Sequence, residues 1–339
     1  MKTSIVTYWQ KIVAAAVTIV TTTIAPNATY AQVLRGSGDS FAEPLYQRYI
    51  QEYQQQTGET FNYTTVGSGG GTRLFMNQSI DFGGTSLIPT PIEQNQMQNG
   101  LLMVPTAGGS ISVIYNLKDV NTNVKLSRDK LAKIFTGQIS NWQQINSRFP
   151  NKKIQVVVCA ESCGTSFILT KYLHAITEGK VPASREPNWG FQVFEALSQD
   201  SAIAGEVRRT DGAIGYVQTN VARVNNISIA SLENKTGRYV SPSLEETKIA
   251  LDNIQFKDDF TTEDIFDPED GYPLVSLTWL LIYKQYLDPE LLTSTQNLLN
   301  WILTEGQEFN EELEYTKIPE DVTTKVIEAV NTELRVRPY

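Results

Sequence analysis

Four short stretches rich in Gly, Ser and Thr carry the residue types that can bind a small anion. They are GSGDSF at 36–41, GSGGGT at 67–72, DFGGTS at 81–86 and ESCGTS at 161–166. Three of them lead into an amphipathic pattern, which is typical of a turn that opens a helix. The first backbone N–H groups of a helix have no partner within it, and the helix dipole adds about half a positive charge there. The spacing therefore predicts several helix N-termini that converge on one small oxyanion.

The sequence lacks the residue sets that nucleotide binding, hydrolysis or metal binding would require. GSGGGT has no Lys to complete a nucleotide P-loop, and GSGDSF lacks the third Gly of a dinucleotide-binding turn. His174 is the only His, no GxSxG turn is present, and neither Ser68 nor Ser162 has a His beside it, so a Ser–His hydrolase is disfavoured. Cys159 and Cys163 have no His nearby to complete a zinc site. We therefore predict no catalytic residue, no metal and no cofactor.

The first 31 residues have the pattern of a secretory signal peptide. Lys2 and Lys11 flank a polar start, an apolar run covers 12–25, and small residues precede an expected cleavage after about Ala31. The run is too short, and too often interrupted by Thr, for a membrane anchor. We expect an exported protein from which residues 1–31 are removed.

The exported chain is expected to be strongly acidic. The 339 residues have a formal charge of −9, and removing residues 1–31 takes away two Lys and no acid, which leaves −11. Such a surface disfavours nucleic acid and anionic membranes as partners. It also repels anions at long range, so an anion site in this chain must use local donors.

Cys159 and Cys163 are the only two Cys of the chain. An oxidising compartment favours a disulfide between them. Two Cys only four positions apart need a bent backbone to reach disulfide geometry, so two small half-buried thiols are the alternative. In a disulfide neither sulfur donates, whereas a free Cys163 could offer a weak S–H donor to an anion.

Helical and strand patterns alternate along the chain, as in an α/β protein. Strands are predicted at 61–66, 80–83, 110–116, 154–158, 212–217 and 274–283, and helices at 45–58, 72–77, 129–135, 168–176 and from 289 and 320 onwards. The strands at 110–116 and 274–283 lie where one lobe could pass to another. We predict two α/β lobes, the first from 32–109 and 274–339 and the second from 110–273, with binding loops at the strand ends.

The order of these motifs resembles the periplasmic phosphate-binding proteins of phosphate ABC importers. The matching segments are 36–41, 67–71, 81–83, 104–106, 164–167 and 212–217, which span nearly the whole mature chain. Each motif is weak alone, but together and in this order they are specific to the family. The resemblance implies a two-lobed, type II-like periplasmic-binding-protein fold that closes at a hinge on a dehydrated phosphate, without catalysis. It also implies a monomer that delivers phosphate to an ABC permease in the inner membrane.

The resemblance also assigns the donors that would bind the anion between the lobes. The first lobe would supply the Ser40 hydroxyl, the Phe41 N–H, and the Ser68 hydroxyl and N–H. The second lobe would supply the Gly164 N–H and the Thr165 hydroxyl and N–H. All of these are small donors at turns, as the residue pattern requires.

Three positions depart from the family pattern. Ser86 stands where the family usually has an Asp that accepts a proton from hydrogen phosphate, Cys159 where it has an Arg, and Cys163 where it has a Ser. Ser86 and Cys163 remain in the predicted site as neutral contacts. Because the charged pair is absent, the resemblance predicts weaker phosphate binding and poorer discrimination against sulfate than is usual in the family.

Two nearby acids could replace the missing acceptor. Asp39 precedes Ser40, and Glu161 lies close to the position of the missing Arg. The pattern favours a simpler interpretation of Asp39, as a turn residue that faces solvent. The altered site also leaves open a paralogue that binds another oxyanion, such as sulfate or arsenate, or that acts as a phosphate sensor or reserve. A secreted phosphatase-like hydrolase is less favoured, because the chain offers no nucleophile with a base or a metal.

Overall fold

The computed structural model describes residues 33–338, except for 161 and 264. The predicted signal peptide, its cleavage site and Glu161 lie outside the described residues. The described residues belong to one compact unit. Its central element is a nine-stranded sheet with the order β2-β1-β3-β12-β4-β8-β6-β7, and β9 (Ser228–Ile229) pairs with β4. No helix among these residues is both long and apolar enough to span a bilayer.

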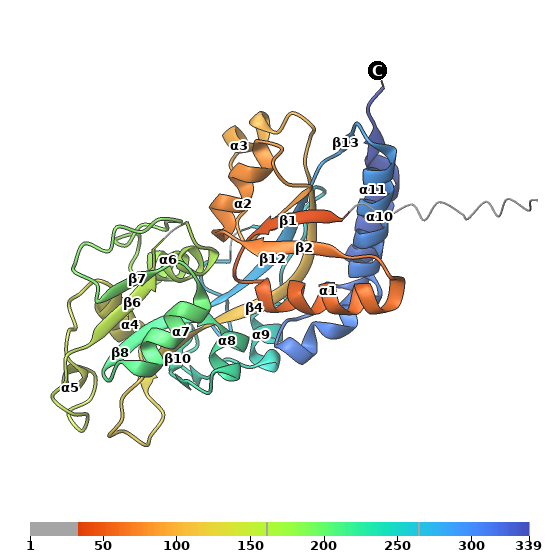
Figure 1. Cartoon of the computed structure of the whole chain (residues 1–339). Helices are drawn as coiled ribbons and strands as arrows, with labels where there is room; N and C mark the ends of the chain where they lie inside the picture. Colours follow the sequence, from red (N-terminus) through yellow and green to blue (C-terminus); the bar gives the residue numbers. More distant parts are fainter. Residues whose placement is uncertain (1–32, 161, 264, 339) are drawn as a thin grey trace, which may run out of the picture. The chain divides into compact units, whose positions relative to one another are not determined.

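Helices accompany the strands at both ends of the sheet, and we call the two ends the first lobe and the second lobe (Figure 1). The first lobe contains β1 (Leu34–Gly38), α1 (Glu43–Thr57), β2 (Phe61–Thr65), α2 (Gly67–Met76), β3 (Phe82–Thr85), α3 (Pro91–Gln96), β12 (Val275–Ile282), α10 (Pro289–Leu303) and α11 (Glu320–Glu333). The second lobe contains α4 (Arg128–Phe135), α5 (Trp142–Ile145), β6 (Gln155–Cys159), α6 (Gly164–Ile176), β7 (Glu195–Leu197), α7 (Asp200–Arg209), β8 (Ala213–Gln218) and α8 (Thr219–Val224).

The first lobe is built on β1, which lies between two parallel partners, β2 and β3. The apolar face of α1 is buried and includes Tyr46, Tyr49 and Tyr53 at helical spacing. The helix ends at Gly58, whose φ of 78° is the left-handed conformation that favours glycine. The Tyr49 hydroxyl donates to Asn310 Oδ1 at 2.5 Å, which ties α1 to the C-terminal part of the chain. The helix predicted after the first Gly-rich turn is therefore confirmed.

A single long strand, β4 (Leu102–Tyr115), runs from one lobe to the other (Figure 1). Up to Ser110 it pairs with β12 in antiparallel fashion, and from Ile111 it pairs with β8. Every residue of both β4 and β12 is buried. The sheet thus continues through the link between the lobes, and the predicted two-lobed α/β fold is confirmed. The lobe boundaries predicted near residues 110 and 274 stay a prediction.

Two elements begin earlier than the sequence pattern indicates. The strand predicted at 110–116 starts at Leu102. Its register against β12 shifts between Thr278 and Trp279, so Thr106 is the extra residue of a β-bulge next to Pro105, a position that tolerates proline within a ladder. The helix predicted from Thr72 starts at Gly67, so the Gly-rich stretch is the first turn of α2 rather than a loop before it. Glycine has a low helix propensity, so the sequence pattern does not indicate that the helix begins at Gly67.

Close packing explains why α2 contains so many glycines. A Cβ at Gly71 would lie 2.5 Å from Gly38 Cα and 2.8 Å from the Ser37 carbonyl oxygen. Both distances are well below normal contact, so the helix can lie this close to β1 only without a side chain at position 71. The glycine therefore fixes the first turn of α2 at the carboxyl end of the strand.

Gly71→Ala is expected to lower the free energy of unfolding by about 1–3 kcal/mol, the usual cost of an extra methyl group in a packed interior. Gly205→Ala is the matched control, because Gly205 lies in α7 and a Cβ there meets no atom within 4 Å. That substitution should raise the free energy of unfolding by about 0.5–1 kcal/mol through helix propensity. Urea denaturation followed by circular dichroism measures both changes, and equal effects would contradict the packing argument.

Candidate anion-binding site

The N-terminus of α6, in the second lobe, lies against three side-chain oxygen atoms of the first lobe. A Cβ at Gly164 would lie 2.6 Å from Ser86 Oγ, 3.0 Å from Asp39 Oδ1 and 3.0 Å from Ser68 Oγ. The backbone of a helix N-terminus is thus brought next to polar groups that follow β1, β3 and the start of α2. Ser68, Ser86 and Gly164, which come from three separate motifs, lie together between the lobes.

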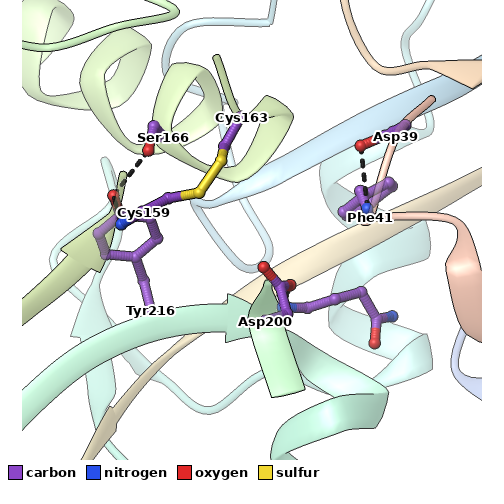
Figure 2. The surroundings of a disulfide bond; sticks show 8 residues. Asp39, Phe41, Cys159, Cys163, Ser166, Asp200 and Tyr216 are labelled. Carbon is purple, nitrogen blue, oxygen red and sulfur yellow. Dashed lines mark hydrogen bonds between the residues drawn. A yellow bond between two sulfur atoms is a disulfide. The ribbon is translucent and has the colours of Figure 1, made fainter. Parts of the chain in front are cut away.

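The first-lobe groups of this cluster are joined by hydrogen bonds. The Ser86 N–H donates to Ser68 Oγ at 3.2 Å, and the Ser86 hydroxyl donates to Asp39 Oδ2. The other carboxylate oxygen, Asp39 Oδ1, accepts from the Phe41 N–H at 2.9 Å (Figure 2). The Phe41 N–H, which the resemblance assigns to the anion, therefore already donates its hydrogen bond to the carboxylate of Asp39.

The interpretation of Asp39 as a solvent-facing turn residue is wrong, because its exposed fraction is 0%. Burial raises the pKa of Asp39 to about 6, while hydrogen bonds from Ser86, the Phe41 backbone and Ser68 oppose the rise. The Asp39 carbonyl accepts from the Tyr63 hydroxyl at 2.9 Å. Tyr63 belongs to β2, so the group that helps to enclose Asp39 comes from a distant part of the sequence that the turn pattern does not reveal.

Ser40 and Phe41 follow Asp39 in the same turn, and both are buried. The Phe41 ring meets the Tyr315 ring edge-on, with 5.9 Å between the ring centroids. The Tyr315 hydroxyl donates to the Phe41 carbonyl at 2.5 Å. The turn is thus held in place by a residue near the C-terminus of the chain.

Thr165, the second residue of α6, offers a hydroxyl donor that no described residue uses. Its side chain is fully buried, and its Oγ1 has no hydrogen-bond partner among the residues that the structure describes. An unmet buried hydroxyl usually costs about 1–3 kcal/mol, so such groups are uncommon. The neighbouring Ser166 hydroxyl, by contrast, lies 2.7 Å from the Tyr216 hydroxyl (Figure 2). Thr165 is therefore a donor of the kind that the anion site requires.

Cys159 and Cys163 are joined by a disulfide in the structure (Figure 2). Cys159 is the last residue of β6 and Cys163 is the N-cap of α6, and both side chains are buried. Of the two alternatives that the spacing leaves open, the structure thus contains the bridge. In this state Cys163 has no S–H to donate. A contact with an anion at this point would have to come from the backbone N–H of the next residue, Gly164.

The sequence analysis missed a second buried carboxyl group, that of Asp200 at the start of α7. Its Oδ2 accepts from the Gln218 N–H at 2.7 Å, and its Oδ1 has no partner within the described part of the chain. Burial raises the pKa of Asp200 to about 7, the Gln218 N–H opposes the rise, and the charges of Asp39 and Glu43 add to it. An acid in the first turn of a helix is too common to stand out in a sequence.

The site contains acids but no basic partner for them. In the described residues neither Asp39 nor Asp200 is stabilised by a cation, and both are held by hydrogen bonds alone. The same residues contain no group of three or more His, Cys, Asp and Glu side chains that could hold a metal ion. The groups that this cluster offers to an anion are backbone N–H groups and hydroxyls, the kind of local donor that an acidic chain requires.

This fold and this cluster between lobes are those of a two-lobed binding protein. A family model described as a PBP superfamily domain matches residues 20–305. The chain is 30% identical over 320 residues to the phosphate-binding protein PstS of Pasteurella multocida, covering 91% of this chain and 92% of that protein. It is 29% identical over 337 residues to the phosphate-binding protein PstS of Methanocaldococcus jannaschii, covering 88% and 86%. The chain therefore belongs to the PBP superfamily and, within it, to the PstS family.

Solved structures share the fold. A high-affinity periplasmic phosphate-binding protein, PfluDING, bound with phosphate, has a TM-score of 0.75 at 18% identity and covers 88% of this chain and 94% of its own. A phosphate-binding protein from Stenotrophomonas maltophilia has a TM-score of 0.73 at 19% identity, with the same coverage. At such identities the likeness concerns the fold, and it agrees with the fold class predicted from the motifs.

Asp200→Asn is expected to raise the melting temperature of the ligand-free protein more at pH 8 than at pH 5. The pKa of the buried Asp200 is raised, so the folded form binds this proton more tightly than the unfolded form does. Stability contributed by the protonated group is therefore lost as the pH rises from about 4 through 7. Asparagine stays neutral and keeps an oxygen acceptor for the Gln218 N–H.

Asp211→Asn is the control for that experiment. A hydrogen bond from Lys152 lowers the pKa of Asp211, so neutralising this group should not stabilise the protein at pH 8. Differential scanning fluorimetry in phosphate-free buffers measures both variants. A stability gain for Asp200→Asn that does not depend on pH would contradict the assignment of a buried, ionising carboxyl group.

Proposed function

We propose that the protein captures inorganic phosphate outside the inner membrane and delivers it to the permease of an ABC importer. The observation that carries this proposal is the cluster of Ser68, Ser86 and Gly164 between the lobes. The unpartnered hydroxyl of Thr165 supports it as a further donor in the same region. The relatives named as phosphate-binding proteins support phosphate as the ligand, and the signal-peptide pattern supports export.

Phosphate capture in this site needs no catalytic group and no cofactor. The first lobe contributes the Ser40 hydroxyl, the Phe41 N–H and the Ser68 donors, and the second lobe contributes the Gly164 and Thr165 donors. Because each lobe holds only part of this set, the full set exists only in the closed form. The paired strands β4 and β12 act as the hinge, and the protein works as a monomer that presents the closed form to the permease.

Asp39 supplies the proton acceptor that Ser86 cannot. Its carboxylate accepts the Ser86 hydroxyl hydrogen bond, so it lies beside the position where the family usually has its Asp. Hydrogen phosphate can donate its proton to this carboxylate, whereas sulfate has no proton and meets it as a like charge. This proposal revises the poorer discrimination against sulfate that the sequence predicts. Arsenate also carries a proton, and it remains the second candidate ligand.

The same carboxylate limits the affinity for phosphate. It accepts from the Phe41 N–H and the Ser86 hydroxyl, so a ligand must compete for these donors or share them. No basic group in the described part of the site offsets the charge of Asp39. The expectation of weaker phosphate binding than is usual in the family is therefore kept.

At pH 8 the wild-type protein is expected to bind phosphate and to exclude sulfate, with an affinity ratio on the order of a hundredfold or more. Asp39→Asn should bind sulfate at this pH, because the neutral amide no longer repels an ion without a proton. Ser86→Ala is the matched control: it removes the neighbouring hydroxyl, keeps the carboxylate, and should still exclude sulfate. Isothermal titration calorimetry with both anions measures the affinities.

The pH dependence gives a second readout of the same group. Burial raises the pKa of Asp39 to about 6, so the carboxyl becomes protonated as the pH falls from 8 to 5. A protonated carboxyl can donate to sulfate, and the sulfate affinity of the wild type should therefore rise on acidification. Asp39→Asn should show a much smaller rise, the part that comes from the titration of Asp200. Strong sulfate exclusion by Asp39→Asn would contradict this account and would leave Glu161 as the acceptor.

Closure of the lobes is expected to accompany binding. Small-angle X-ray scattering should give a smaller radius of gyration with saturating phosphate than without it, because only the closed form brings the donors of both lobes to the ligand. An unchanged radius at saturation would show that the protein binds without hinge closure.

A further inference from the structure

Ser162, in the second lobe, packs against the first turn of α2 in the first lobe. Its carbonyl accepts from the Gly69 N–H at 3.4 Å. A Cβ at Gly67 would lie 2.6 Å from that carbonyl oxygen, and a Cβ at Gly69 would overlap the Ser162 hydroxyl and lie 2.7 Å from its Cβ. Ser162 is buried. One residue of the second lobe thus fills the space that two glycines of the first lobe leave open, and we call this arrangement the interlobe contact.

The interlobe contact satisfies a backbone group that α2 cannot satisfy itself. The first N–H groups of a helix need a partner outside the helix. For the Gly69 N–H that partner is the Ser162 carbonyl, which belongs to the other lobe. This contact is separate from the groups assigned to the anion, but it forms only when the lobes are together. Opening the lobes must break it and expose both groups to water.

The disulfide restricts the backbone on both sides of Ser162 in the sequence. Ser162 lies between Cys159 and Cys163 in the sequence, and the bridge closes a small ring around it. One end of the ring is anchored in the sheet, where the Cys159 N–H donates to the Tyr216 hydroxyl at 3.2 Å. The other end is the N-cap of α6. Without the bridge, closing the lobes would also have to order this segment, at a cost in conformational entropy.

We propose that Ser162 is a positioning residue that stabilises the closed form, and that the Cys159–Cys163 disulfide holds it in place, so that reduction of the disulfide speeds release of the anion. This inference rests on the proposed function, because the interlobe contact affects ligand release only if the closed form holds a ligand. Reduction by a dithiol breaks the Sγ–Sγ bond. Each sulfur gains one electron and one proton, and the dithiol is oxidised to its own disulfide.

The first test compares the release of radiolabelled phosphate from three forms of the full-length mature protein: oxidised wild type, wild type reduced with dithiothreitol, and the double variant Cys159→Ser, Cys163→Ser. Reduction and the double substitution should each raise the dissociation rate roughly fivefold to tenfold, the factor that the loss of one hydrogen bond corresponds to. The association rate should change much less, because the contact forms only after the ligand has bound and the lobes have closed.

The second test probes the contact itself. Gly69→Ala adds a methyl group where Ser162 lies, and it should raise the dissociation rate at least as much as reduction does. Adding Ser162→Gly to this variant removes the two Ser162 atoms that the methyl group would overlap and leaves only an ordinary contact with Arg73 Nη1, so it should bring the rate back part of the way. Gly205→Ala, a helical glycine with open space around it, is the control and should leave the rate unchanged.

The outcomes separate this inference from the proposed function. If oxidised wild type binds no phosphate, the proposed function fails, and the interlobe contact has no ligand to retain. If it binds phosphate, but reduction and Gly69→Ala leave the dissociation rate unchanged, the proposed function stands and the role of Ser162 is overturned. Equal dissociation rates for Gly69→Ala with and without Ser162→Gly would also overturn it, because the effect of the methyl group would then not depend on Ser162.

Discussion

A carboxyl group that is buried between two lobes, with no basic partner among the described residues, constrains the groups around it. Asp39 is withdrawn from water, and its charge is met by the Phe41 N–H and by the hydroxyl of Ser86. An ionised carboxylate in such a place is costly unless it is hydrogen-bonded. A second Asp at position 86 would put two like charges at hydrogen-bond distance, which neither could tolerate in ionised form. A neutral hydroxyl at position 86 avoids this repulsion, and it also donates a hydrogen bond to the Asp39 carboxylate.

In the second lobe a disulfide stands where the related proteins usually have a positively charged residue. Where the related proteins usually have an Arg, this chain has Cys159, and the structure bonds it to Cys163 at the head of α6. In the proposed site, the backbone of Gly164 and the hydroxyl of Thr165, which has no partner among the described residues, take the place of that charge. Such a site depends on how firmly the helix N-terminus is held. A covalent ring immediately before the helix is a direct way to hold it.

The sequence predicts those parts of this protein that follow from local patterns. The Gly-rich turns and most strands could be recognised because each depends on neighbouring residues, and the two-lobed architecture because these motifs follow one another in the order of a known family. Asp39 could not be recognised in this way, because its burial depends on Tyr63 from another strand. The start of α2 was missed for a similar reason: Gly71 contradicts helix propensity, and only the nearness of Gly38 explains it. Asp200 gives no local signal at all, since its environment is created by the packing of α7 on β8.

The position of β12 in the sheet has a consequence for how the chain reaches its folded state. This strand lies between β3 and β4, yet it follows the whole second lobe in the sequence. The first lobe cannot complete its sheet until Ile282, at the end of β12, has been synthesised. Pairings between such distant segments form slowly, because a long loop must be closed first. A nascent chain therefore lacks the central strand of the first-lobe sheet through most of translation, and this lobe can complete its core only after the second lobe has been synthesised.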